Sequence, residues 1–436
     1  MLSLLLIIIY TTILIFCLIK ITRSYRNYLS ARQASLSFLI KIVFGLAYGY
    51  LFLKFYNGDD TWLYQNLSLI EYQNLLHHPG KFFMNVGNGI PGNAGINSFY
   101  DTKNSFWNNL DDVILIKLFA IFNVFSFGHY AVNVVLFCFL VSLGSLLLYR
   151  LLIAYFPGSS LLLKLAIFYN PMTIFWLSGL RKEGLLFLAL ALVLFYFNRL
   201  MSKQRHLIVS ILFSLLGLSL LLFMRNLVFM CLVPSLIAWS IHRFFKLKAL
   251  IIFPAVYTGC IIIFFSGGMI PGLPDLADKV TQRQYNYLNL VANTRLPLDS
   301  LRGTASSYLH VLPQAINHSF LRPYITEAKG MLQVISAADI YLFFLSACLA
   351  VRFRNDDWKK MLQQPILLTC LYTSLFAYLV IGYTVPYPGT FIRYKAIFEL
   401  LFLCVFAAIT DLKKVPISSI NKNDILYLLE KYFRKI

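Results

Sequence analysis

Long apolar runs separated by short polar segments dominate the sequence from end to end. A run of about 20 apolar residues is long enough to cross a lipid bilayer as a helix. Runs of this kind predict an all-α integral membrane protein with about 11 transmembrane helices. The predicted spans are residues 2–19, 37–56, 130–149, 161–177, 184–198, 207–224, 226–241, 249–266, 336–351, 363–383 and 396–410.

Polar residues gather in a few segments between these spans. Residues 57–128 form a first large loop that ends in the apolar stretch 113–127. This stretch is too short to span a membrane, which predicts a helix lying at the membrane interface. Residues 267–335 form a second large loop, and 411–436 form a basic tail. No segment resembles a separate soluble domain, so residues 1–436 are predicted to form a single membrane domain.

The charged residues indicate which way the chain crosses the membrane. There are 38 Lys and Arg residues against 18 Asp and Glu, a net charge of +20. With the N-terminus outside, the inner segments hold 23 basic and 5 acidic residues, and the outer segments hold the remaining 15 and 13. The inner side therefore carries +18, as the cytoplasmic side of a membrane protein does. We therefore expect a cytoplasmic C-terminus and two outer loops. This distribution favours topology over nucleic-acid binding as the reason for the charge.

Composition excludes several other classes of protein. Hydrophobic residues make up 59% of the chain and charged residues 13%, whereas soluble proteins carry about 25% charged residues. All seven cysteines lie in apolar runs without C-x-x-C spacing. Disulfides and structural zinc are therefore not expected. The histidines lack the spacing of a metal site, and we predict no metal-ligating residues.

An acidic pair, Asp59 and Asp60, directly follows the second predicted span. A carboxylate at a membrane surface can remove a proton from a hydroxyl group. The pair could also hold a divalent cation, the one cofactor that the sequence leaves open. The structural alternative is that an Asp caps a helix over Thr61–Leu76, since Asp is a favoured N-cap residue.

Basic residues interrupt the apolar sequence at three places on the predicted outer face. The first group is Arg181, Lys182 and Glu183, and the second is Arg225. Arg and Lys can bind a phosphate, and Glu183 can orient one of them. The alternative for these residues is an exposed turn whose side chains reach water.

The third group, Arg393 and Lys395, precedes the last predicted span. In a helix these two side chains point apart, whereas in an extended segment they point to one side. Either residue could instead anchor the end of that span. We expect no acidic residue in the middle of a span, which argues against a proton-coupled transporter.

The order of these features resembles the GT-C superfamily of membrane glycosyltransferases. The shared features are an acidic pair at the head of the first outer loop, an interfacial helix, about 11 spans and a late basic motif. The segments Asn170–Gly184 and Phe391–Lys395 more narrowly resemble bacterial cell-surface polysaccharide proteins of this type. The chain departs from the superfamily by an additional span before the acidic loop.

The resemblance implies an inverting membrane glycosyltransferase at the outer face of a bacterial inner membrane. Asp59 or Asp60 would be the catalytic base that deprotonates the acceptor hydroxyl. The donor would be a sugar linked to polyprenyl phosphate or diphosphate, and the acceptor a saccharide or a lipid-linked saccharide. The residues expected to bind the substrates are Arg181, Lys182, Glu183, Arg225, Arg393 and Lys395.

Three other functions remain open from the sequence. A polysaccharide repeat-unit polymerase would use the same chemistry with a larger donor. A flippase or another transporter of lipid-linked oligosaccharides should carry charged residues deep among its helices. A non-catalytic assembly partner should lack converging acidic and basic groups.

Overall fold

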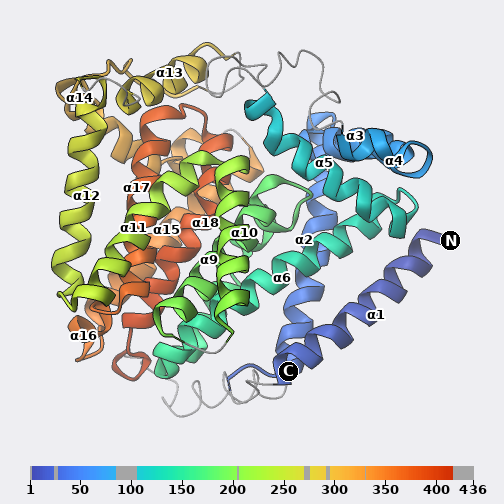
Figure 1. The fold of residues 1–436 in the computed structure, drawn as a ribbon, viewed down its shortest axis with the longest axis horizontal. Helices are drawn as coiled ribbons and strands as arrows, with labels where there is room; N and C mark the ends of the chain where they lie inside the picture. Colours follow the sequence, from blue (N-terminus) through green and yellow to red (C-terminus); the bar gives the residue numbers. More distant parts are fainter. Residues whose placement is uncertain are drawn as a thin grey trace. The chain divides into compact units, whose positions relative to one another are not determined.

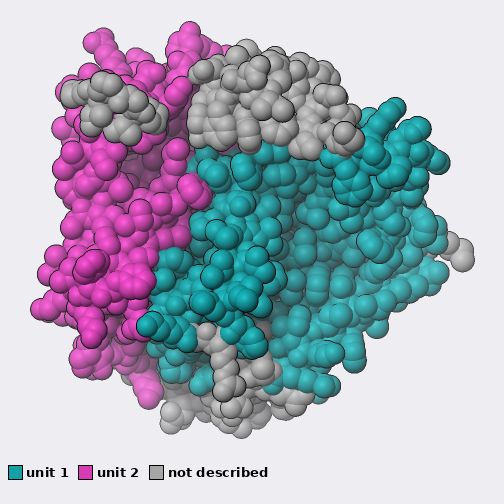
Figure 2. Space-filling view, in the orientation of Figure 1, with its two compact units in different colours: residues 1–226, 416–436 teal, residues 227–415 magenta. Residues whose placement is uncertain are grey.

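The structure is a computed structural model that describes residues 2–23, 28–84, 106–203, 206–269, 275–290, 295–328 and 330–415. Within these residues the chain forms helices and no β-strand, as the sequence predicts. Parts of both predicted outer loops, and the tail after residue 415, lie outside the described residues. The chain divides into two compact units (Figure 2). Unit 1 contains the described residues up to Asn226, and unit 2 is Leu227–Val415.

Nine helices of the described chain are long and apolar enough to cross a membrane. Each coincides with a predicted span, because a helix satisfies its own backbone hydrogen bonds in an apolar surrounding. They are α1 (Leu2–Thr22), α2 (Ala31–Tyr56), α6 (Tyr130–Tyr155), α9 (Lys182–Met201), α10 (Leu207–Met224), α11 (Asn226–Phe245), α12 (Ala249–Ser266), α15 (Met331–Arg352) and α17 (Pro365–Thr384) (Figure 1).

The predicted span at 161–177 forms a bent pair of helices instead of one straight helix. Pro157–Phe168 and α8 (Pro171–Ser178) meet at an angle of 46°. A proline disfavours the helical conformation of the residue before it, so the helix ends before Asn170. The side chain of Asn170 then caps α8 by accepting a hydrogen bond from the backbone N–H of Thr173 at 3.0 Å.

The last predicted span, 396–410, begins earlier than expected. Helix α18 is Pro388–Ile409 and starts with a proline, the residue best suited to the first turn of a helix. Arg393, Lys395 and Glu399 therefore lie within the helix. These charges explain why α18 is not among the nine apolar helices. Glu399, which the predicted span 396–410 would place near one end, lies in the middle of α18.

The described parts of the predicted loops also form helices. In unit 1 they are α3 (Asp60–His77), α4 (Pro79–Met84) and α5 (Phe106–Ser126), with α3 packed on α5 (Figure 1). In unit 2 they are α13 (Leu276–Leu288), α14 (Ala305–Ile316) and α16 (Trp358–Leu362). The apolar stretch predicted at the interface is part of the longer α5, and its place at the interface stays a prediction.

Glycine allows α2 to pack closely against its neighbours in unit 1. Helix α2 contacts both α6 and α8. A Cβ atom at Gly45 would lie 2.6 Å from the backbone oxygen of Ser178 and 2.7 Å from the side chain of Val134. Tyr48, one turn further along α2, is fully buried and stacks on Phe52 with ring centroids 4.4 Å apart. The close packing at Gly45 thus places the Tyr48 hydroxyl near the residues that follow α8.

We expect Gly45→Ala to destabilise the protein. The added methyl group would force α2 away from the backbone that follows α8, and overpacking of this kind costs about 1–3 kcal/mol. Gly259→Ala in α12 is the matched control, because a Cβ there meets nothing within 4 Å. The apparent unfolding temperature in detergent should fall for Gly45→Ala and not for Gly259→Ala. Equal unfolding temperatures for the two variants would contradict this packing argument.

Candidate functional site

Asp59 caps the helix that follows it. Helix α2 ends in two residues with left-handed backbone, Asn57 at φ 53° and Gly58 at φ 74°, which turn the chain sharply. Asp59 follows in an extended conformation, and its carboxylate accepts a hydrogen bond from the backbone N–H of Thr61 at 3.0 Å. The capping interpretation of the acidic pair is therefore confirmed. Capping is not the only interaction of Asp59, because the same carboxylate also has a second partner.

Arg181 is that second partner, and it brings the two predicted groups together. Its guanidinium donates to the carboxylates of both Asp59 and Asp60. It also donates to the hydroxyl of Tyr48 at 2.6 Å, and Tyr48 in turn donates to Asp59 at 3.2 Å. The Arg181 side chain is only 3% exposed, whereas that of Asp60 is 48% exposed. The site is thus open to solvent from the Asp60 side.

The turn between α8 and α9 positions Arg181. Gly179 lies against the ring of Tyr48, where a Cβ atom would come within 2.7 Å. The backbone N–H of Arg181 donates to the carbonyl of Gly179 at 2.7 Å, which closes the turn. Thr61 then donates its hydroxyl to the carbonyl of Leu180 at 3.0 Å. This turn is therefore fixed to both α2 and the start of α3.

Glu183 and Arg225 extend the same cluster. One carboxylate oxygen of Glu183 lies 3.7 Å from Nε of Arg181, and the other lies 3.8 Å from a guanidinium nitrogen of Arg225. Glu183 is buried in the first turn of α9, where the partial positive charge of a helix N-terminus stabilises a carboxylate. Arg225 comes from the C-cap of α10. One ion-pair cluster within unit 1 therefore contains five of the predicted site residues: Asp59, Asp60, Arg181, Glu183 and Arg225.

Lys182 points to a second acidic pair, which sequence reasoning missed. Its ammonium group binds Asp111 and lies 2.7 Å from a carboxylate oxygen of Asp112. The hydroxyl of Tyr64 donates to Asp112 at 2.6 Å. Both acids lie in α5, directly before the apolar stretch predicted at the interface. Like Asp59 and Asp60, these two acids lie next to an apolar run. The same sequence feature could therefore have identified Asp111 and Asp112 as candidate site residues.

Burial shifts the pKa of two carboxyl groups at this site, those of Asp59 and Asp111. It raises the pKa of Asp59, although the guanidinium of Arg181 acts in the opposite direction. Burial likewise raises the pKa of Asp111, against the effect of Lys182. Burial would lower the pKa of Arg181, but Tyr48 and the surrounding carboxylates raise it well above its usual value. Arg181 therefore stays charged, while Asp59 takes up a proton more readily than an ordinary Asp.

Arg393 and Lys395 lie in unit 2 and have different surroundings. Because both are within α18, their side chains point apart, as expected for a helix. The Arg393 guanidinium lies over the ring of Tyr394, 5.0 Å from its centroid. Lys395 is only 3% exposed and donates to the backbone carbonyl of Ser319 at 3.3 Å. The structure thus separates the environments of two residues that the sequence grouped together.

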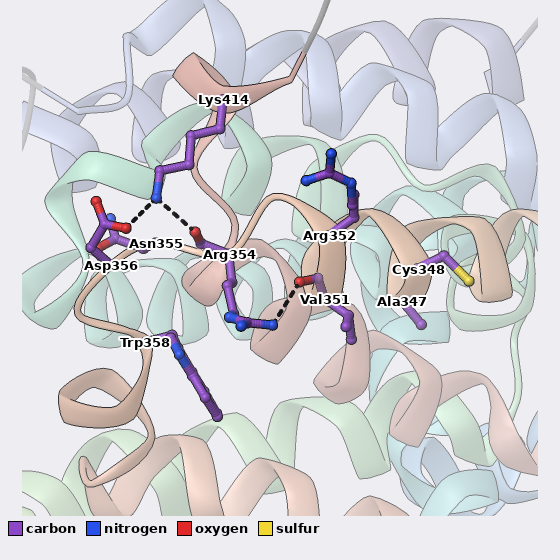
Figure 3. Close-up of a pocket in the computed structure, with 9 residues that line it drawn as sticks. All are labelled: Ala347, Cys348, Val351, Arg352, Arg354, Asn355, Asp356, Trp358 and Lys414. Atoms are coloured by element: carbon purple, nitrogen blue, oxygen red, sulfur yellow. Dashed lines mark hydrogen bonds and ion pairs between the residues drawn. The ribbon is translucent and has the colours of Figure 1, made fainter.

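Unit 2 also contains a cavity of about 910 Å³ at the end of α15 (Figure 3). Lys414 crosses one side of it to reach Asp356 and the carbonyl of Arg354, and the Arg354 guanidinium lies 5.4 Å from the ring of Trp358. None of the predicted site residues lines this cavity. Its lining residues are Ala347, Cys348, Val351, Arg352, Arg354, Asn355, Asp356, Trp358 and Lys414.

Comparison with protein-family models, with curated proteins and with solved structures finds no match for this chain. The resemblance to membrane glycosyltransferases therefore rests on the short motifs and their order along the sequence. Among the described residues, no group of three or more His, Cys, Asp or Glu side chains is arranged to hold a metal ion.

We expect Arg181→Gln to destabilise the protein by about 3–5 kcal/mol, because it leaves the largely buried carboxylate of Asp59 without its cation. Combining it with Asp59→Asn should recover part of this loss, with a coupling energy of about 0.5–3 kcal/mol. The control cycle pairs Arg181→Gln with Glu71→Gln, since Glu71 contacts Lys117 instead. Denaturation in detergent measures both cycles. An additive Asp59 cycle would contradict a direct interaction between Asp59 and Arg181.

Proposed function

We propose that the protein is a membrane glycosyltransferase. It would transfer a sugar from a polyprenyl-phosphate or polyprenyl-diphosphate donor to a saccharide or lipid-linked acceptor. The reaction would take place at the outer face of a bacterial inner membrane, during synthesis of a cell-surface polysaccharide or glycoconjugate. The observation that carries this proposal is the contact of Arg181 with both Asp59 and Asp60. It joins the groups that would deprotonate the acceptor to a group that would bind the donor phosphate.

The position of the cluster supports a substrate with a lipid anchor. Asp59 follows α2 and Arg181 precedes α9, and both helices are suited to cross a membrane. The ends of such helices lie near the boundary between hydrocarbon and water. The phosphate of a polyprenyl lipid lies at the same depth, so its headgroup could reach this cluster while its chain stays in the membrane.

The carboxylates support acid–base chemistry with a hydroxyl acceptor. Asp60 is half-exposed and so can be reached from solvent, and burial strengthens Asp59 as a base by raising its pKa. In the proposed step the acceptor oxygen attacks the anomeric carbon, and the bond from that carbon to the phosphate oxygen breaks. The acceptor proton passes to Asp59 or Asp60, and the polyprenyl phosphate or diphosphate leaves with the bonding electrons. Such a reaction passes through an oxocarbenium-like state.

Arg181 would stabilise the charge that develops on the leaving phosphate. In the structure its guanidinium donates to carboxylates, so it has to exchange at least one of them for phosphate oxygens. Proton transfer to Asp59 or Asp60 neutralises that carboxyl group and weakens its pairing with Arg181. The guanidinium would thus become available as negative charge grows on the phosphate, when stabilisation lowers the barrier most. The Arg181 guanidinium would be oriented by Lys182, Glu183 and Arg225. Arg393 is a second candidate for binding phosphate.

A repeat-unit polymerase would share this site and differ only in the size of its donor.

A flippase or transporter of lipid-linked oligosaccharides is the second candidate, and a specific observation favours it. The expectation that no acidic residue lies within a span is wrong, because Asp339 lies inside α15 and Glu399 inside α18, both buried. Charged residues within the helices are a feature expected of a transporter.

We expect loss of transfer when both carboxyl groups are removed. The double variant Asp59→Asn with Asp60→Asn should lower the transfer rate by about 10²–10⁴-fold, the usual contribution of a general base. Cells lacking the protein should accumulate a polyprenyl-linked saccharide, which lipid extraction and mass spectrometry would detect. The wild-type chain should clear this lipid, and the double variant should not.

Glu71→Gln is the matched control for this experiment. Glu71 lies on the same helix, α3, and forms an ion pair with Lys117 at 3.3 Å, so its loss also removes a partly buried contact. This variant should clear the lipid, with each variant's abundance in the membrane measured alongside. Full activity of both Asp59→Asn and Asp60→Asn as single variants would rule out the proposed base.

A further inference from the structure

Four polar side chains meet in the interior of unit 2, and none of them belongs to the ion-pair cluster around Arg181. Asp339 comes from α15, Tyr378 from α17, and Lys395 and Glu399 from α18. Their exposed fractions are 9%, 1%, 3% and 5%, so the cluster is closed to solvent. Because α15 and α17 are both suited to cross a membrane, these groups lie among membrane-spanning helices. Ionisable residues in such surroundings are rare and usually functional.

The two carboxyl groups are neighbours. Helices α15 and α18 pack on each other, and Asp339 and Glu399 interact with each other, as does Glu399 with the hydroxyl of Tyr378. Lys395 interacts with both carboxyl groups through its charge and donates to the carbonyl of Ser319 at 3.3 Å. Its ammonium group lies 5.9 Å from the ring centroid of Tyr378. Lys395 and Tyr378 are therefore the charged and titratable groups that face the carboxyl pair.

A hydrogen bond between two carboxyl groups requires a proton. An ionised carboxylate has only acceptor oxygens, so two ionised groups would repel each other instead of bonding. With one shared proton, the pair carries a single negative charge, which the ammonium of Lys395 balances. Without that proton the cluster carries a net charge of −1 in surroundings that stabilise charge poorly. The burial of two acids beside one lysine therefore favours one proton on the carboxyl pair.

Aromatic rings pack around Tyr378. The ring of Tyr378 lies 4.8 Å from that of Phe320, 5.2 Å from that of Phe402 and 6.4 Å from that of Phe343, measured between centroids. Asp339 is the most exposed of the four groups, at 9%, so a proton would reach the pair through its carboxyl group.

We propose that Asp339 and Glu399 form a proton-binding site within the membrane, which holds one proton that Lys395 balances in charge. The site takes up and releases this proton through the carboxyl group of Asp339. It is independent of the ion-pair cluster around Arg181 and goes beyond the glycosyltransferase proposal. The ligand is the proton itself, and no further cofactor is required.

Infrared spectroscopy of the purified full-length chain in detergent tests the site directly. At neutral pH the wild type should show the C=O stretch of a protonated carboxyl group in an apolar environment. Glu399→Gln and Asp339→Asn should each lack this band, whereas Glu71→Gln in unit 1 should keep it. A wild-type spectrum without the band at neutral pH would show that both carboxyl groups are ionised and would overturn the proposal.

Chemical labelling of the wild type gives a second test that needs no variant to fold. Dicyclohexylcarbodiimide reacts with protonated carboxyl groups in apolar surroundings and leaves ionised surface carboxylates largely unmodified. Peptide mass spectrometry should find one adduct per chain, on Asp339 or Glu399, with less labelling as the pH is raised. Adducts on other carboxyl groups, together with no infrared band, would establish an ion cluster without a bound proton.

Discussion

The interaction on which the rest of unit 1 depends is that of the Arg181 guanidinium with Asp59, Asp60 and Tyr48. Removing a charged group from water costs several kcal/mol, and partners recover this only when the geometry is good. Here Tyr48 comes from α2, Asp59 and Asp60 come from the start of α3, and Arg181 itself comes from the turn before α9. These segments must therefore meet before Arg181 can be buried. The contact at Gly45 and the sharp turn at Gly58 are two of the features that make this possible.

The charge of the cluster is as informative as its geometry. Five acids, Asp59, Asp60, Asp111, Asp112 and Glu183, accompany three cations, Arg181, Lys182 and Arg225. If all were ionised, this part of a chain whose net charge is +20 would carry −2. The neighbouring carboxylates add to the effect of burial, which raises the pKa of Asp59 and of Asp111. A carboxylate with a raised pKa is a stronger base, as removal of a proton from a hydroxyl acceptor requires.

Hydrophobic runs predicted most of the fold, because each apolar span corresponds to a helix or a bent pair of helices. The sequence also placed Asp59 and Arg181 on the same predicted face, although 122 residues separate them, because topology assigns each polar segment to one side. It could not show that Arg181 contacts both carboxylates, since that depends on how α2, α8 and α9 pack.

The sequence also missed two acidic pairs, because their contacts depend on how the helices pack. Asp111 and Asp112 contact Lys182 only because α5 packs on α3, and no local spacing reports that contact. The predicted span 396–410 would place Glu399 near a helix end, whereas α18 already begins at Pro388. The meeting of Glu399 with Asp339 depends on the packing of α15 against α18, which the sequence of neither helix can show.

The most direct test of the central claim is an experimental structure of the protein in lipid with a polyprenyl phosphate bound. The proposal predicts the phosphate within hydrogen-bonding distance of Arg181, with at least one of Asp59 and Asp60 turned from the guanidinium toward the acceptor side. A phosphate bound elsewhere, with both carboxylates still paired to Arg181, would contradict it. In that case the cluster would be a structural element that joins the ends of α2 and α9.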